Sequence, residues 1–372
     1  MTSTQRYKKI KDPIVAIFIR RLGWSETSVV LFFVGLSALI FLGLGGVASS
    51  TYVGAGRKIL SLDNLGFLIV WMLVFLPILF GMYLWQIRAI DQLMESLIRN
   101  DIFRKDAKEE IRNQQDKIFL SMSDKWIYIS AIIFMVIFWL YQILVGWPQQ
   151  FEHVRQFWYD VAWYLPFHIF GWIIGLYALY ILVIRQTLIA LSIAKIMEKA
   201  DLSLEILDPD SAGGLGEIGE FIKTSSMYAI GLGVVAALYA VEVYLSSAQI
   251  LERVDVIGFF IVYLVFMPLC LISPWRNTSK AMLKARSKVL EPISLEFQET
   301  LQSAQTKIAD VSTEEIKAIN ERLDQLQKHR AIILNNFPTT PIPDSTLRKF
   351  SISASLPILS GITSILLQIF GR

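Results

Sequence analysis

The sequence predicts an all-α membrane protein with six transmembrane helices, which extend into a cytoplasmic helical bundle and precede a C-terminal amphipathic helix. Composition is the first reason: of 372 residues, 54% are apolar and only 18% are charged, outside the usual range of soluble proteins. The second reason is a set of six long apolar windows. The third is a strong asymmetry in the distribution of Lys and Arg along the chain.

Each apolar window is long enough to cross the hydrocarbon core of a bilayer, which requires ~20 residues of α-helix. Five of the six contain no Asp, Glu, Lys or Arg. Lipid offers backbone amides no hydrogen-bond partner, so a spanning segment without strand partners must be helical. The windows are 28–48, 66–86, 126–146, 164–184, 227–247 and 256–275.

The basic residues predict the orientation of these spans, because loops rich in Lys and Arg stay in the cytoplasm. If the spans alternate in direction, only Arg57, Lys58, Arg155 and Arg253 of the 35 basic residues lie on the outer side. The basic tail 1–27 and the C-terminus are therefore both expected in the cytoplasm. The expected location is a cell membrane that the chain crosses several times.

Helical spacing of apolar residues continues beyond the spans. Segments 87–125 and 185–226 are expected to extend spans two and four into the cytoplasm, and 276–336 is expected to be a cytoplasmic helical or coiled-coil region. In that region Ile316, Ile319, Leu323, Leu326 and Ile333 share one seam. The seam predicts packing within the chain's own bundle or, alternatively, association between subunits.

Three prolines interrupt the helices within the linker 337–344. The following segment 345–372 has an apolar face and an opposite face carrying Ser353, Ser360, Ser364 and Gln368. This pattern predicts an amphipathic helix that lies in the cytoplasmic interface or docks on the bundle. A seventh, re-entrant membrane element is the alternative.

The densest local motif is the glycine-rich loop, residues 207–219, between spans four and five. Its glycines permit positive φ angles and close backbone approach, and its amides could bind an anion. It lacks the Lys-Ser/Thr of a phosphate-binding loop and the glutamate that completes a calcium loop. It is interpreted as a tight turn into span five or as a ligand or gating site, with candidate residues Asp208, Asp210, Gly213, Gly214, Gly216 and Gly219.

The string Pro-Asp-x-x-Gly-Gly-Leu-Gly within this loop (209–216) resembles one found in uncharacterised bacterial multi-pass inner-membrane proteins. The resemblance covers about a dozen residues. It implies a location in a bacterial cell inner membrane and no particular activity.

Glu242 is the one acidic residue inside a window. An ionisable group in a membrane is expensive to bury and indicates function by default. Because Glu242 lies near the outer end of span five, it is a candidate intramembrane site or else a carboxylate that faces water or pairs with Arg253. Pro77 and Pro268 are expected to kink spans two and six.

Small residues at four-residue spacing predict close helix packing within the membrane. They lie on spans four and five. The candidates are Gly171, Gly175, Ala229, Gly233 and Ala237.

No catalytic constellation is visible. His153, His168 and His329 are scattered, and Cys270 is the only cysteine, so no disulfide within the chain and no cysteine-based zinc site can form. We expect no enzyme activity, no metal and no cofactor. The net charge of +3 is spread along the chain, which makes nucleic acid an unsuitable partner.

Three functions remain open. The leading hypothesis is an oligomeric channel or pore gated from the cytoplasmic side, since uncharged spans suit a hydrophobic gate. The alternative is a membrane-anchored signalling or assembly scaffold. Transporters commonly contain inverted repeats and charges at the bilayer midplane. A secondary transporter ranks third, because no convincing inverted repeat relates the first three windows to the last three, and the one acidic residue in a window, Glu242, lies near an end of its span. The expected partners are the lipid bilayer and further copies of the chain.

Overall fold

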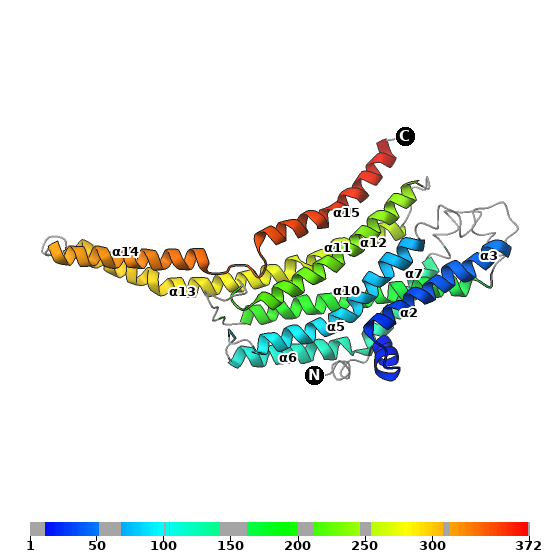
Figure 1. Cartoon of the computed structure of the whole chain (residues 1–372), viewed down its shortest axis with the longest axis horizontal. Helices are drawn as coiled ribbons and strands as arrows, with labels where there is room; N and C mark the ends of the chain where they lie inside the picture. Colours follow the sequence, from blue (N-terminus) through cyan, green and yellow to red (C-terminus); the bar gives the residue numbers. More distant parts are fainter. Residues whose placement is uncertain are drawn as a thin grey trace.

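The computed structural model describes residues 12–51, 68–99, 102–103, 105–141, 144, 162–199, 202, 212–245, 254–307 and 313–370. Within them the chain is helical, and an isolated antiparallel bridge joins Phe103 to Leu202. Figure 1 shows a bundle of long helices with a narrow helical projection at one end. The elements are η2 (Val15–Arg21), α2 (Glu26–Ala38), η3 (Leu39–Leu44), α3 (Gly45–Thr51), η4 (Trp71–Phe75), α5 (Leu76–Arg99), α6 (Lys105–Met122), α7 (Lys125–Tyr141), α10 (Leu165–Lys199), α11 (Gly216–Leu245), α12 (Val254–Cys270), α13 (Ile272–Lys307), α14 (Thr313–Asn336) and α15 (Asp344–Phe370).

Five helices of the described chain are long and apolar enough to cross a membrane, and there are up to six if α6 and α7, which are bent by 43°, count as one broken span. The prediction of a multi-pass helical membrane protein is confirmed at this level. The five run over Glu26–Ser50, Leu68–Arg99, Leu165–Lys199, Gly216–Val241 and Val256–Gln305.

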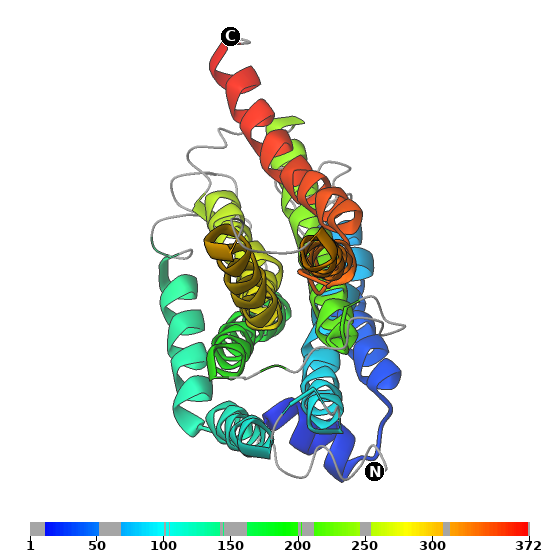
Figure 2. The same ribbon diagram turned by 90° about the vertical axis from the view of Figure 1, so that its left-hand side faces the viewer.

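Helix α10 lies inside the bundle and contacts α5, α6, α7, α12 and α13. Its 35 residues give a length of ~52 Å at 1.5 Å per residue, much longer than a hydrocarbon core of ~30 Å. In the view along the bundle (Figure 2), α6 and α7 lie on one side, while α2, α5, α11 and α15 lie on the other.

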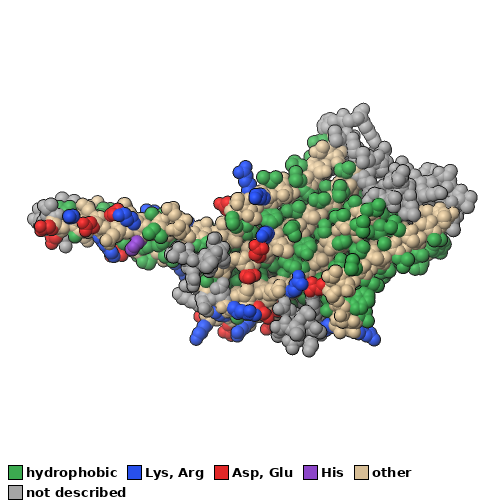
Figure 3. All heavy atoms as spheres, viewed as in Figure 1, with side chains coloured by type: hydrophobic (Ala, Val, Ile, Leu, Met, Phe, Trp, Pro, Cys, Tyr) green, Lys and Arg blue, Asp and Glu red, His purple; other side chains and the backbone are tan. Residues whose placement is uncertain are grey.

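The surface of the bundle is apolar where a soluble protein would be polar. Helix α7 buries one stripe, which includes Ala131 and Trp139, and exposes large apolar side chains around the rest of its circumference; Ile137 is 61% exposed. In Figure 3, hydrophobic side chains cover the body, and charged ones gather on the projection and next to it. Such a surface suits lipid as solvent.

The projection is a hairpin of α13 and α14, called here the cytoplasmic hairpin after its expected location. Helix α14 returns along α13 (Figure 1). Leu326 and Ile333 of the predicted seam are buried, Ile316 is exposed, and Arg322 Nε donates to Glu296 Oε1 at 3.0 Å. The seam therefore packs within the chain, which is one of the two arrangements that the spacing allows.

Candidate functional site: a glycine-loop dock and a buried ion pair

The described part of the glycine-rich loop forms a tight turn at the start of α11. Gly213 and Gly214 have φ angles of 62° and 86°, a left-handed region that glycine enters without steric penalty. Both are buried, and α11 begins at Gly216. The candidate residues Asp208 and Asp210 lie outside the described residues.

The Pro-rich linker packs directly on this loop. A Cβ atom added to Gly219 would lie 2.2 Å from the carbonyl oxygen of Pro341, so only glycine allows the two backbones to approach this closely. Pro341 and Ile342 are buried at the contact. The loop therefore docks the segment that leads into α15.

A pocket of about 580 Å³ lies between the loop and the linker. Its polar side chains are those of Glu217, Glu220, Lys223 and Thr346, and Lys223 Nζ pairs with Glu220 Oε1 at 3.2 Å. These carboxylates are exposed, and no group of His, Cys, Asp and Glu residues suited to a metal occurs among the described residues. The pocket offers no built ligand site.

Glu242 belongs to α11, and its side chain lies outside the described residues. Its assignment as an intramembrane site stays a prediction.

Both predicted proline kinks coincide with irregular helix. Pro77 is the second residue of α5 and follows the π-helical turn η4, whose wider spacing accommodates a residue with no N–H donor. Pro268 lies two residues before the end of α12.

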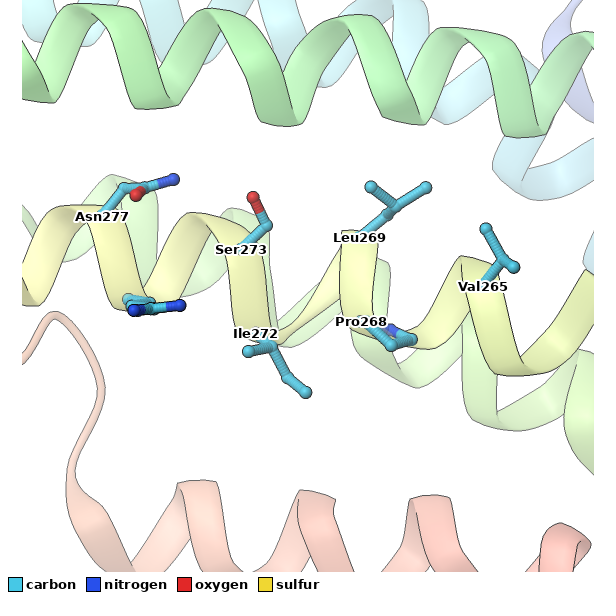
Figure 4. A pocket seen from close by; sticks show the side chains of 7 residues that line it. Val265, Pro268, Leu269, Ile272, Ser273 and Asn277 are labelled. Atoms are coloured by element: carbon cyan, nitrogen blue, oxygen red, sulfur yellow. The ribbon is translucent and has the colours of Figure 1, made fainter.

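An open pocket of about 350 Å³ lies at Pro268, and its other lining residues also come from α12 and α13. Figure 4 shows that Val265, Leu269 and Ser273 point to one side of these helices and that Pro268 and Ile272 point to the other.

The small residues on α10 and α11 lie against aromatic rings. A Cβ atom on Gly171 would lie 2.8 Å from Phe41 of η3, and one on Gly175 would lie 2.7 Å from Trp71 of η4. Both π-helical turns thus pack on the glycines of α10. On α11, Gly233 lies against Tyr263, and Ala229 and Ala237 are buried.

A second site, which the sequence analysis did not predict, is a buried ion pair between Asp12 and Arg185. Arg185 Nη2 donates to Asp12 Oδ2, and the side chains are 0% (Asp12) and 1% (Arg185) exposed. The phenol of Tyr83 donates to the same carboxylate oxygen. The guanidinium carbon of Arg185 lies 4.3 Å from the centre of the Tyr83 ring, which is cation–π distance.

Local structure explains why Asp12 occupies this position. Its other oxygen, Oδ1, accepts a hydrogen bond from the Val15 backbone at 3.0 Å, so the side chain caps the first turn before η2, where unpaired N–H groups favour an acceptor. Pro13 follows it, a residue suited to the first turn of a helix. The carboxylate therefore has three donors from the chain: Val15 N–H, Tyr83 and Arg185.

An amide pair lies beside the ion pair. Gln86 Nε2 donates to Gln186 Oε1 at 2.7 Å, and both residues are 0% exposed. Within the described chain Gln86 Oε1, Gln186 Nε2 and Arg185 Nε have no hydrogen-bond partner. Buried polar atoms of this kind are few in native proteins and call for a specific explanation.

The ion pair lies at one boundary of the apolar spans. Arg185 is 20 residues after the start of α10, which is ~30 Å or one hydrocarbon thickness. Arg88, five residues after Tyr83 on α5, pairs with Glu26 at the start of α2, with an Nη1–Oε2 distance of 3.1 Å. The side chains of Arg88 and Glu26 are 44% and 28% exposed, so the Asp12–Arg185 pair is the more buried of the two.

Arg185 directly follows the fourth window, and a single basic residue at that place fits a topology signal equally well. Asp12-Pro13 before the apolar run 14–19 is a helix-start signal that could have drawn attention to this aspartate. The pairing itself joins residues 173 positions apart and has no local signature.

Comparisons with known proteins give no further guide. No protein-family model, no curated protein and no solved structure matches this chain.

Proposed function

We propose that the protein is a membrane channel whose path for solutes is closed at its cytoplasmic end by the Asp12–Arg185 ion pair. The observation that carries the proposal is the complete burial of this pair between the N-terminal segment and the spans α5 and α10. Ionisable groups inside a membrane protein commonly mark an ion or substrate path.

The energetics of such a pair suit a gate. Removing each ion from water costs several kcal/mol, and the attraction between the two offsets this cost only when the geometry is good. The paired, dry state and a hydrated, separated state can therefore lie close in free energy. A signal with a modest difference in affinity for the two states is then sufficient to shift their populations.

The neighbouring polar atoms support the same interpretation. Arg185 Nε and the free ends of Gln86 and Gln186 are hydrogen-bonding groups buried beside the pair. They would become ligands for water or a permeating ion once the pair separates. Apart from Glu242, the six apolar windows contain no charged residue, which suits gating by wetting.

A secondary transporter is the second candidate, and the ion pair favours it as well. Coupled transporters use buried charges that change partners during alternating access. The two functions differ in behaviour: a channel passes ions down any gradient once it is open, whereas a transporter moves a solute only with its coupling ion.

The test is ion flux in proteoliposomes and conductance in planar bilayers with potassium chloride as the probe. The double variant Asp12→Asn/Arg185→Gln removes both charges together and leaves no single buried ion. We expect it to conduct more than the wild type without any added ligand. Thermal unfolding in detergent verifies that the variant is folded.

The matched control is Glu26→Gln/Arg88→Gln, which removes the more exposed ion pair between α2 and α5 and is expected to leave flux unchanged. If neither the wild type nor the double variant conducts at any membrane potential, the channel proposal fails. Flux that requires a second ion gradient would instead favour the transporter.

A further inference from the structure

The C-terminal helix α15 buries its small residues and exposes its large apolar ones, the opposite of a helix that packs on a protein in water. It buries Ala354, Pro357, Gly361 and Ser364. It exposes its large apolar side chains, each between 47% and 58%: Ile352, Leu356, Leu359, Ile362 and Leu366. A water-soluble helix would bury the leucines and isoleucines instead.

The buried face of α15 packs on two spans. A Cβ atom on Gly361 would lie 2.5 Å from the ring of Phe260 in α12, and one on Gly233 of α11 would lie 3.0 Å from Pro357. Tyr263 of α12 donates its hydroxyl hydrogen to the carbonyl oxygen of Ala354 at 2.8 Å. Figures 1 and 2 both show α15 running beside α11.

These contacts place α15 at the depth of the spans. The linker meets the start of α11 at Gly219, and Pro357 meets Gly233 further along the same helix, so the two helices run in the same direction. A helix lying flat in the cytoplasmic interface would contact the ends of α11 and α12, and α15 instead follows their length.

The chemistry of the segment permits insertion. After Lys349, residues 350–371 contain no charged side chain, and the part of α15 from 350 to its end at Phe370 corresponds to ~31 Å of helix, enough to cross a hydrocarbon core of ~30 Å. Two of its serines are partnered within the helix: Ser355 Oγ donates to Ile352 O at 2.7 Å, and Ser364 Oγ donates to Ser360 O at 2.9 Å. Such bonds satisfy hydroxyls where no water is present.

We infer that α15 is a seventh membrane-spanning helix whose exposed face contacts lipid acyl chains. This face continues the apolar surface of its neighbours, where Leu238 of α11 and Ile261 and Leu264 of α12 are also exposed. The end of α15 at Phe370 then lies on the side of the membrane opposite to the cytoplasmic hairpin, whereas the distribution of basic residues alone predicted a cytoplasmic C-terminus. The placement does not depend on what the protein transports.

The distribution of basic residues agrees with this topology. Twelve of the thirteen Lys and Arg residues after the sixth window precede residue 350, and Arg372 is the thirteenth. The basic residues that predict a cytoplasmic location for the hairpin therefore also predict a cytoplasmic location for the start of α15. They do not prevent the other end of α15 from crossing the membrane.

Reporter fusions test the inference in the full-length chain. Two reporters are used: alkaline phosphatase, which is active only outside the cytoplasm, and green fluorescent protein, which is fluorescent only inside it. Each is fused after Arg372 or inserted within residues 308–312, between α13 and α14. We expect green fluorescence from the loop and phosphatase activity from the C-terminus. The same compartment for both positions would overturn the inference.

A smaller perturbation provides the second measurement. In a Cys270→Ser background, Leu359→Cys on the exposed face of α15 and Ser345→Cys near its start are treated with a membrane-impermeant maleimide in leaky vesicles open to both sides. We expect Ser345→Cys to react at once and Leu359→Cys to react only after detergent is added. Equal rates would show that the exposed face of α15 is in water.

Discussion

At the scale of single residues, the Asp12 carboxylate is the centre of the buried polar site. It accepts hydrogen bonds from Tyr83, Arg185 and the Val15 backbone, and it joins the N-terminal segment to two spans. Hydrogen bonds to a charged acceptor contribute more to stability than neutral ones, ~1.5–3 against ~0.5–1.5 kcal/mol. Because of this difference, conservative substitutions at Asp12 and its donors should change the free energy of unfolding by measurable amounts.

Tyr83→Phe removes one donor to Asp12 and keeps the ring that lies against Arg185. We expect unfolding in detergent to become easier by ~1.5–3 kcal/mol. Tyr180→Phe is the control, because the Tyr180 hydroxyl donates to the neutral Ser130 hydroxyl at 3.1 Å, and a smaller loss is expected. Equal losses for the two variants would argue against a charged acceptor at Asp12.

A double-mutant cycle measures the coupling between Asp12 and Arg185. Asp12→Asn leaves Arg185 as an uncompensated buried charge and is expected to destabilise the fold by ~3–5 kcal/mol. The double variant with Arg185→Gln should recover a large part of this loss. Strictly additive losses in a thermal or denaturant titration would mean that the two groups do not interact.

At the scale of elements, the apolar periodicity of the sequence was sufficient to place the long apolar helices, but not η2, which lies within the segment 1–27 that was expected to be a basic tail. Helices α5 and α10 continue past their windows to Arg99 and Lys199, as the spacing of apolar residues predicts. Each helix is specified by local pattern, so local reasoning is enough to find it. The packing partners of α15 and of the glycine-rich loop are distant in sequence and could not be found in this way.

Gly219→Ala tests the dock between the loop and the linker. The added Cβ would meet the Pro341 carbonyl at 2.2 Å, so we expect the linker to detach and limited proteolysis near residues 337–343 to accelerate. Gly258→Ala on α12 is the control, because open space surrounds that position. An unchanged cleavage rate in Gly219→Ala would show that the linker does not depend on the contact.

At the scale of the whole molecule, the class of protein was predictable and the site was not. Composition and the apolar windows indicate the solvent to which the whole chain is suited. They were therefore enough to predict a helical membrane protein. The Asp12–Arg185 site depends on a tertiary contact that brings an N-terminal segment to the fourth span, and a lone Arg after a window has a simpler reading as a topology signal.

Oligomeric state belongs to the same scale. Leu326 and Ile333 of the predicted seam of α14 are buried within the chain, so this part of the seam is not available for association of subunits. If subunits share the pore, native mass spectrometry from nanodiscs is expected to show a multiple of the 42.4 kDa chain. A particle of one chain that still conducts would place the path within a single bundle.

The claim on which the rest depends is that lipid is the solvent of the exposed apolar surface. Spin labels attached to Ile132→Cys on α7 and Ile261→Cys on α12, in the Cys270→Ser background, report it directly in bilayers. We predict frequent collisions with oxygen and rare collisions with a water-soluble nickel chelate at both positions, and the reverse at Leu301→Cys on the cytoplasmic hairpin. Nickel collisions as frequent at Ile132→Cys and Ile261→Cys as on the hairpin would contradict the account.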